Sequence, residues 1–228
     1  MESLDLSKLV NKKVLFFSPH MDDDAISAGA LLYSLAKKNT IISVYVTNSA
    51  KGVSKDLSFE KKVKLRQVEG LKSCKLLGVK ALFLNMDNPV LEVTKSNINL
   101  ISDLLSKECP DIVFIPVSYD AHPTHAKVHD LVLEAARDVH IGEFWFYEVW
   151  TPITNPNFLY FFDKNIMKIK VRAIKQHKSQ LERTDFVKAV LGLDTFRCVL
   201  GEELVSGFGG VSKIHGEYAE AFLISKKL

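Results

Sequence analysis

Short apolar runs alternate with longer segments of helical periodicity along most of the chain. The apolar runs are rich in β-branched and aromatic residues, which favour strands, and they cover residues 13–17, 41–47, 81–84, 111–116, 144–150 and 157–162. Helical spacing of apolar positions appears in residues 25–38, 57–77, 96–107 and 164–182 and in a segment with Thr124 as its N-cap. This alternation is typical of βαβ units. It predicts an α/β fold with a mostly parallel sheet and helices on both faces.

The last part of the chain, residues 191–228, has no clear period. Its glycines, at positions 201, 207, 209, 210 and 216, predict loops around short elements. No repeat, low-complexity segment or shift in composition marks a linker. We therefore expect residues 1–228 to form a single domain, a length within reach of one α/β unit.

Charge and cysteine content narrow the class of protein. The 30 basic and 27 acidic residues leave a net charge of +3 that is spread along the chain, which does not favour a nucleic-acid partner. The three isolated cysteines are typical of a reducing compartment rather than of a disulfide framework. No run approaches the roughly 18 apolar residues of a membrane span, and the first residues lack the apolar core of a secretion signal. We expect a cytoplasmic protein without a membrane span.

Polar residues crowd into two loops, each of which follows an apolar strand. The first loop runs from Ser18 to Asp24 and carries His20 and three carboxylates, and the second runs from Tyr119 to His125. In the common doubly wound order the two preceding strands are neighbours, and ligands bind beyond their carboxyl ends. The two loops are therefore expected to meet in space.

Two histidines and one carboxylate are a usual ligand set for a catalytic zinc ion, which keeps its fourth position for water. His20 and Asp23 can turn toward the same point, and His125 points back toward the start of its own helix. The carboxylates left over would overfill the site, so one is free to act as a base. Taken singly, helix capping explains the first loop and chance explains the second, but the pair favours a metal. His129 is a rival ligand, although its deeper position fits a core-edge histidine better.

With these motifs the chain resembles the PIG-L/LmbE-like family of zinc-dependent N-acetylglucosaminyl deacetylases. The family's P-H-x-D-D and H-x-x-H loops correspond to residues 19–23 and 122–125. Weaker landmarks follow in the family's order, at residues 66–69 (R-x-x-E), 147–150, 175–180 and 219–222.

The resemblance implies a Rossmann-like fold and removal of the N-acetyl group from an N-acetylglucosamine-type sugar conjugate by metal-activated water. By motif position, the zinc ligands would be His20, Asp23 and His125. Another divalent metal such as Fe²⁺ is an alternative to zinc. The expected partner is a small amino-sugar substrate, and a homo-oligomer is compatible with the sequence.

The resemblance also assigns roles to four further residues. Asp22 would be the general base, and His122 would stabilise the oxyanion as a charged or hydrogen-bonding group. Arg66 would face the sugar or a phosphate, and Tyr147 would also bind substrate.

Three positions depart from the family's pattern. Met21 stands where proline is usual, and Asp24 stands where glutamate is common. Thr124 replaces an aspartate and so removes the carboxylate expected to orient His122. Asp120 could supply the missing charge if its loop folds inward.

Two other functions fit the same motifs. One is a metal-dependent amidase or esterase acting on a non-sugar substrate, and the other is a metal-binding module without turnover. The aromatic run 144–150 could form a sugar-stacking wall, which favours the carbohydrate reading modestly, although such runs more often belong to a core.

Overall fold

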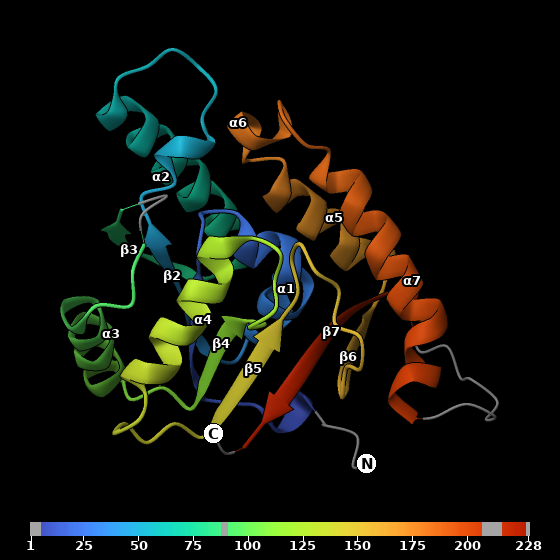
Figure 1. Ribbon diagram of the computed structural model, residues 1–228. Coiled ribbons are helices and arrows are strands. Elements are labelled where there is room, and N and C mark those ends of the chain that lie inside the picture. Colours follow the sequence, from blue (N-terminus) through green and yellow to red (C-terminus); the bar gives the residue numbers. More distant parts are fainter. Residues whose placement is uncertain (1–5, 88–90, 207–215, 227–228) are drawn as a thin grey trace.

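A seven-stranded sheet in the order β3-β2-β1-β4-β5-β7-β6 forms the centre of the molecule (Figure 1). The computed structural model describes residues 6–87, 91–206 and 216–226. The strands are β1 Lys13–Ser18, β2 Thr40–Thr47, β3 Lys80–Met86, β4 Ile112–Pro116, β5 Glu143–Tyr147, β6 Phe158–Phe162 and β7 Tyr218–Ser225. The first five pair in parallel, and β7 runs antiparallel to both β5 and β6. The expected Rossmann-like α/β fold with a mostly parallel sheet is confirmed.

Helices cover both faces of this sheet. They are α1 Asp23–Leu35, α2 Phe59–Leu77, α3 Lys95–Glu108, α4 Pro123–Ala135, α5 Lys164–Ile174, α6 Lys178–Leu181 and α7 Phe186–Ser206, with short 3-10 turns at Leu6–Lys8 and Ala50–Gly52. Apolar residues of α1, α2, α5 and α7 pack on one face. Residues of α3 and α4 pack on the other. The two buried layers hold the strands, and therefore the loops at their ends, in fixed positions.

Local sequence signals explain most of the helix ends. Ser58 caps α2 by accepting a hydrogen bond from the Lys61 backbone N–H, and Gly78 ends that helix at φ 75° as expected. The expected start of α4 was wrong by two residues, because His122 rather than Thr124 is its N-cap. The Nδ1 atom of His122 accepts the Thr124 backbone N–H at 3.2 Å, a bond that a sequence pattern does not reveal.

The expectation of loops around short elements beyond residue 191 was also wrong. Helix α7 continues to Ser206, and β7 then inserts between β5 and β6. Gly201 lies inside α7, where an added Cβ would come within 2.6 Å of Leu159, so close packing explains this glycine better than a turn does. Glycines 207, 209 and 210 lie outside the described residues.

The segment predicted as one helix over residues 164–182 is divided. Helix α5 ends at Ile174, and α6 begins only at Lys178. The break lets the backbone N–H and the hydroxyl of Ser179 donate to Glu69 of α2 at 2.8 and 2.7 Å. A tertiary contact therefore overrides the helical period.

None of the described helices combines the length and apolar character needed to cross a membrane. All seven strands described belong to one sheet. That the whole chain forms a single domain stays a prediction.

Candidate metal and catalytic site

The two polar loops do meet. Strands β1 and β4 pair directly in parallel, as expected, so the β1–α1 and β4–α4 loops emerge side by side at the carboxyl edge of the sheet (Figure 1). His20 belongs to the first loop, and Asp23 is the first residue of α1. His125 comes from the first turn of α4.

Three side-chain atoms converge there at nearly equal spacing. His20 Nδ1 lies 3.2 Å from His125 Nε2, and each of these nitrogens is 3.3 Å from Asp23 Oδ2. A tetrahedral zinc ion with ligand bonds of about 2.0–2.1 Å separates its ligand atoms by about 3.3–3.4 Å. The residues present therefore fit a small tetrahedral metal ion.

The pKa values of Asp23 and His125 indicate which of their atoms hold a proton when no metal is bound. Burial acts to raise the pKa of Asp23, but His125 and His20 hold it well below its usual range. Burial acts to lower the pKa of His125, but Asp23 and Asp120 raise it to about 10. The cluster thus favours positive charge at its centre, and a bound metal ion would displace the proton that His125 otherwise holds.

His122 completes a group of three histidines at this site. A ligand nitrogen from each of His20, His122 and His125 lies within 4.8 Å of the others, a spacing that could hold a metal ion. The triangle that includes Asp23 is tighter, which favours that set over three histidines. Burial and the neighbouring histidines lower the pKa of His122 to about 4, so its imidazole is neutral at pH 7. Because Nδ1 accepts the Thr124 N–H, the neutral ring carries its proton on Nε2.

Asp120 contacts residues of the candidate centre through both of its carboxylate oxygens. Its Oδ1 accepts the His122 backbone N–H at 2.9 Å, and its Oδ2 accepts the Trp150 N–H at 3.1 Å. Oδ2 is also 3.6 Å from His125 Nδ1, an atom that has no hydrogen-bond partner. The carboxylate therefore faces the ring of His125, and its hydrogen bond to His122 is made through the backbone N–H.

Asp22, the expected base, is held by a buried arginine. Its Oδ1 accepts a 2.8 Å hydrogen bond from Arg66 Nη2, and Arg66 Nη1 lies 3.3 Å from Glu69 Oε2. Glu69 in turn binds Ser179 of α6. This chain of contacts fixes one carboxylate oxygen of Asp22 and leaves the other without a described hydrogen bond.

The two expected substrate-binding residues lie in the interior. Arg66 is 1% exposed and is directed at Asp22 rather than at solvent. Tyr147 is fully buried, and its hydroxyl donates to the Phe17 carbonyl oxygen at 2.7 Å. Substrate contact by either side chain stays a prediction, and both have structural partners here.

Sequence reasoning gave no role to His177. This residue is 1% exposed, and neither of its ring nitrogens has a hydrogen-bond partner. Burial lowers its pKa to about 4, with Asp22 opposing and Arg66 reinforcing the shift. The H-x-S-Q segment that contains it was a visible landmark, but only the fold brings it near Asp22. His129, the rival ligand, has Nδ1 2.8 Å from the Pro116 carbonyl oxygen and packs on Phe146.

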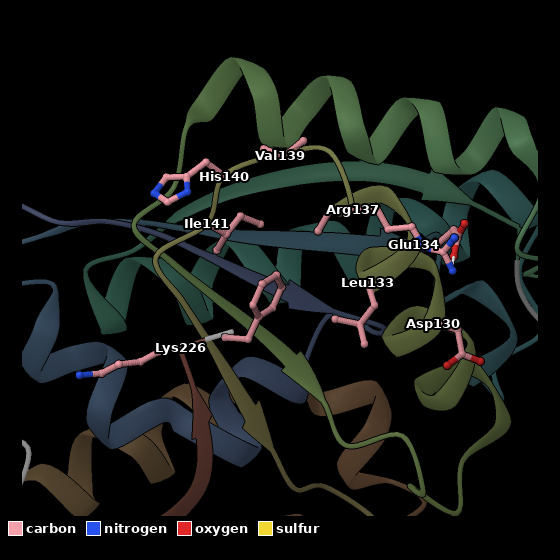
Figure 2. Close-up of a pocket in the computed structure, with 10 residues that line it drawn as sticks. Asp130, Leu133, Glu134, Arg137, Val139, His140, Ile141 and Lys226 are labelled. Carbon is pink, nitrogen blue, oxygen red and sulfur yellow. Dashed lines mark ion pairs between the residues drawn. The ribbon is translucent and has the colours of Figure 1, made fainter. Parts of the chain in front are cut away.

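A large cavity lined by described residues is remote from this chemistry. A hollow of about 880 Å³ lies between the end of α4, the segment leading into β5 and Lys226 (Figure 2). Glu134 and Arg137 on its rim pair with each other at 2.7 Å. A second cavity, of about 230 Å³, includes Trp150, whose ring centroid is 6.2 Å from that of His122. This smaller cavity approaches the candidate centre through Trp150.

Comparisons with known proteins place this chain among deacetylases. The model of the PIG-L family, described as GlcNAc-PI de-N-acetylase, matches residues 15–136. A diacetylchitobiose deacetylase of Thermococcus kodakarensis is 28% identical over 189 residues, which are 74% of this chain and 70% of that protein.

Solved structures share the fold. N,N'-diacetylchitobiose deacetylase from Pyrococcus horikoshii, in complex with its inhibitor MPG, has a TM-score of 0.79 at 24% identity, covering 97% of this chain and 85% of that one. A zinc-inhibited form of teicoplanin deacetylase has a TM-score of 0.68 at 14% identity and covers 95% and 99% of the two chains. Because the family match spans both polar loops and more than half of the chain, the protein belongs to the PIG-L family and is a hydrolase of the de-N-acetylase type.

Proposed function

We propose that the protein is a metal-dependent deacetylase that removes the N-acetyl group from an amino-sugar conjugate. The observation that carries this proposal is the convergence of His20, Asp23 and His125, at 3.2–3.3 Å from one another, beside the spare carboxylate of Asp22. The diacetylchitobiose deacetylases among the relatives support an N-acetylated sugar as the substrate class.

Zinc is the metal that we propose, held by His20, Asp23 and His125. When bound, it would supply a Lewis acid that polarises the acetyl carbonyl and makes water acidic enough to react near neutral pH. A structural relative is described in a zinc-inhibited form, so the resident metal has to be tested against Fe²⁺ and other divalent ions.

Asp22 is the proposed proton carrier. Arg66 holds Oδ1 at 2.8 Å and so presents the other carboxylate oxygen, which takes a proton from the attacking water and passes it to the leaving amine. The arginine acts here by positioning Asp22, which differs from the sugar-facing role that the family resemblance suggests.

His122 is the proposed oxyanion donor. Its Nδ1 is engaged as the cap of α4, so its Nε2–H is the group that can donate a hydrogen bond to the negative oxygen that develops on the carbonyl. With a pKa lowered to about 4, the ring acts as a neutral donor at pH 7. This sharpens the sequence expectation of a charged or hydrogen-bonding group.

The test is acetate release from a panel of N-acetylglucosamine conjugates, N-acetylated amides without a sugar and acetate esters. The metal-free protein is loaded separately with Zn²⁺, Fe²⁺ or Mn²⁺, and the metal content is measured in parallel. We expect release from sugar amides only with metal bound. Turnover confined to non-sugar amides or esters would favour the amidase or esterase alternative, and tight metal binding with no turnover would favour the non-catalytic module.

A ligand variant makes the same test sharper. His125→Ala removes one of three protein ligands and is expected to lower metal content and activity together. His129→Ala, on the same helix, is the matched control and should keep the metal. Normal metal content in His125→Ala would refute the ligand assignment and bring His129 forward.

The remaining expectations rest on composition. The three cysteines are free, in keeping with a reducing compartment, and we propose a cytoplasmic location on that ground. Formation of a homo-oligomer stays a prediction, to be measured by light scattering.

A further inference from the structure

The cavity of about 230 Å³ that includes Trp150 lies between three parts of the fold. The first turns of α1 contribute Ile26, and the segment after β5 contributes Trp150. Helix α7 closes the far side with side chains that include Ala189, Val190 and Leu193. The walls are therefore mainly apolar.

One wall of this cavity approaches the candidate centre through Trp150. Trp150 is 48% exposed, and its ring centroid is 6.2 Å from that of His122. Ser27, which also lines the cavity, donates from its hydroxyl to the backbone carbonyl of Asp23 at 2.6 Å. A group that extends from the carbonyl carbon under attack past His122 and Trp150 would enter this cavity. In an N-acyl sugar that description fits the acyl chain, because the aglycone at the anomeric carbon is separated from the carbonyl by the amide nitrogen and the ring.

The acidic groups on the cavity's floor are already paired. Glu148 is bound by Arg197 Nε at 3.0 Å and by the Ile153 backbone N–H. Asp194 and Glu220 both pair with Lys170 Nζ, at 2.8 and 2.7 Å. Each of these carboxylates already has a cationic partner, and most of the remaining lining side chains are apolar, so burying a polar substrate group here would be unfavourable. The lining therefore suits an uncharged apolar group.

From these observations we propose that the cavity receives a short apolar acyl chain, so that the enzyme hydrolyses N-acyl amino sugars with acyl groups of about four to six carbons better than N-acetyl ones. The inference rests on the proposed function and extends its substrate class. The reaction is an ordinary hydrolysis: one water is added across the C–N bond, which releases the carboxylate of the acyl chain and the free amine. No other reactant is required.

The experiment compares kcat/KM for N-acetyl-, N-butanoyl- and N-hexanoylglucosamine and for p-nitrophenyl N-acetylglucosaminide. Because apolar pockets discriminate about tenfold or more per methylene, we expect at least a tenfold preference for the butanoyl over the acetyl compound. A preference for acetyl among the N-acyl compounds would overturn the proposal. A gain seen only with the p-nitrophenyl compound would also overturn it and would assign the cavity to the aglycone.

Variants of α7 test whether the cavity is the cause of the preference for the longer acyl chain. Ala189 is solvent-exposed at its rim, so Ala189→Phe fills the space without disturbing the core. We expect it to lower kcat/KM for the butanoyl compound at least tenfold and to change the acetyl value by less than about threefold. Val199→Phe, at a position 52% exposed on the same helix, is the matched control and should change neither value. Equal effects of Ala189→Phe on both substrates would contradict the proposal.

A binding readout separates this inference from the proposed function. Trp145 is fully buried, so Trp150 is the tryptophan whose fluorescence reports on the cavity. We expect N-butanoylglucosamine to change this signal at concentrations at least tenfold lower than N-acetylglucosamine does, and Trp150→Phe to abolish the change. Absence of turnover on every substrate would refute the deacetylase function, whereas equal binding of the two sugars would refute the acyl pocket.

Discussion

Two groups of buried charges lie along helix α1, and they are built in opposite ways. At its start, His20, Asp23 and His125 direct their ligand atoms at one point, and His125 Nδ1 has no hydrogen-bond partner. Against its middle, Lys170 Nζ of α5 is closed in by Asp194 and Glu220 at 2.8 and 2.7 Å. The first group is arranged around a common centre, and in the second each charge meets its counter-charge.

The second group also provides hydrogen-bond acceptors for backbone N–H groups of α1. Ala28 has non-helical angles, and the Ala30 and Leu31 N–H groups that the kink frees are bound by Glu220 at 2.8 and 2.9 Å. An added Cβ at Gly29 would come within 3.1 Å of the Lys170 side chain, so the glycine makes room for the lysine. Burial raises the pKa of Asp194 to about 7, against the opposing effect of Lys170. A shifted pKa in a buried carboxylate therefore does not by itself identify chemistry; convergence on a shared point is the better criterion.

The largest expected effect is a loss of activity when Asp22, beside the first group, is changed. Asp22→Asn keeps an oxygen that can accept from Arg66 but loses the ability to take a proton, so we expect activity to fall by about 10²–10⁴. Metal content and the free energy of unfolding should change little. Steady-state kinetics, metal analysis and urea denaturation check these three outcomes. Turnover near the wild-type value would exclude Asp22 as the base, and loss of metal would make it a ligand.

The second effect is on stability, at the middle group. Lys170→Met leaves two carboxylates buried without their cation, and we expect the free energy of unfolding to fall by about 3–5 kcal/mol. The triple variant Lys170→Met, Asp194→Asn, Glu220→Gln removes the charges together and should recover part of the loss. Urea denaturation measures both, and metal titration of the folded protein should give wild-type affinity. A metal affinity that fell with Lys170→Met alone would mean that the two groups are coupled.

The third effect is a pH dependence of the free energy of unfolding, caused by His177 near Asp22. Its pKa is 6.5 in the reference state and about 4 when folded, so between these values the unfolded chain binds more protons. The free energy of unfolding should therefore be fully retained above pH 6.5 and fall by about 3 kcal/mol as pH drops toward 4. His177→Gln does not titrate and should lack this contribution. Denaturation curves from pH 4 to 8 for the two proteins should diverge on the acid side, and parallel curves would refute the prediction.

The smallest effect concerns Asp120, which faces the ring of His125. Asp120→Asn weakens the carboxylate's support of that ligand, and we expect metal affinity to fall by about 10–100-fold. Asp130→Asn, at an exposed position of α4, is the matched control. Competition with a chelator measures both affinities. Unchanged affinity in Asp120→Asn would confine the carboxylate to its backbone contacts with His122 and Trp150.

Much of the site could be predicted from sequence because its determinants are local. A polar loop directly after an apolar strand must emerge at the strand's carboxyl end, and the neighbour rule for parallel sheets then brings two such loops together. The positions of His20, Asp23 and His125 follow from these two facts. The strands and helices up to residue 162 follow from hydrophobic period in the same way.

Other features of the site and fold were decided only by the tertiary structure, because they depend on contacts between distant segments. The sequence cannot tell that Arg66 turns inward to Asp22, that His122 caps α4 with its own ring, or that Asp120 faces His125 instead of His122. Nor does it reveal that the C-terminal segment supplies α7 and a strand between β5 and β6. Period and propensity report only on near neighbours along the chain, whereas the partner of a buried charge, and the wall of a cavity, are set by which surfaces pack together.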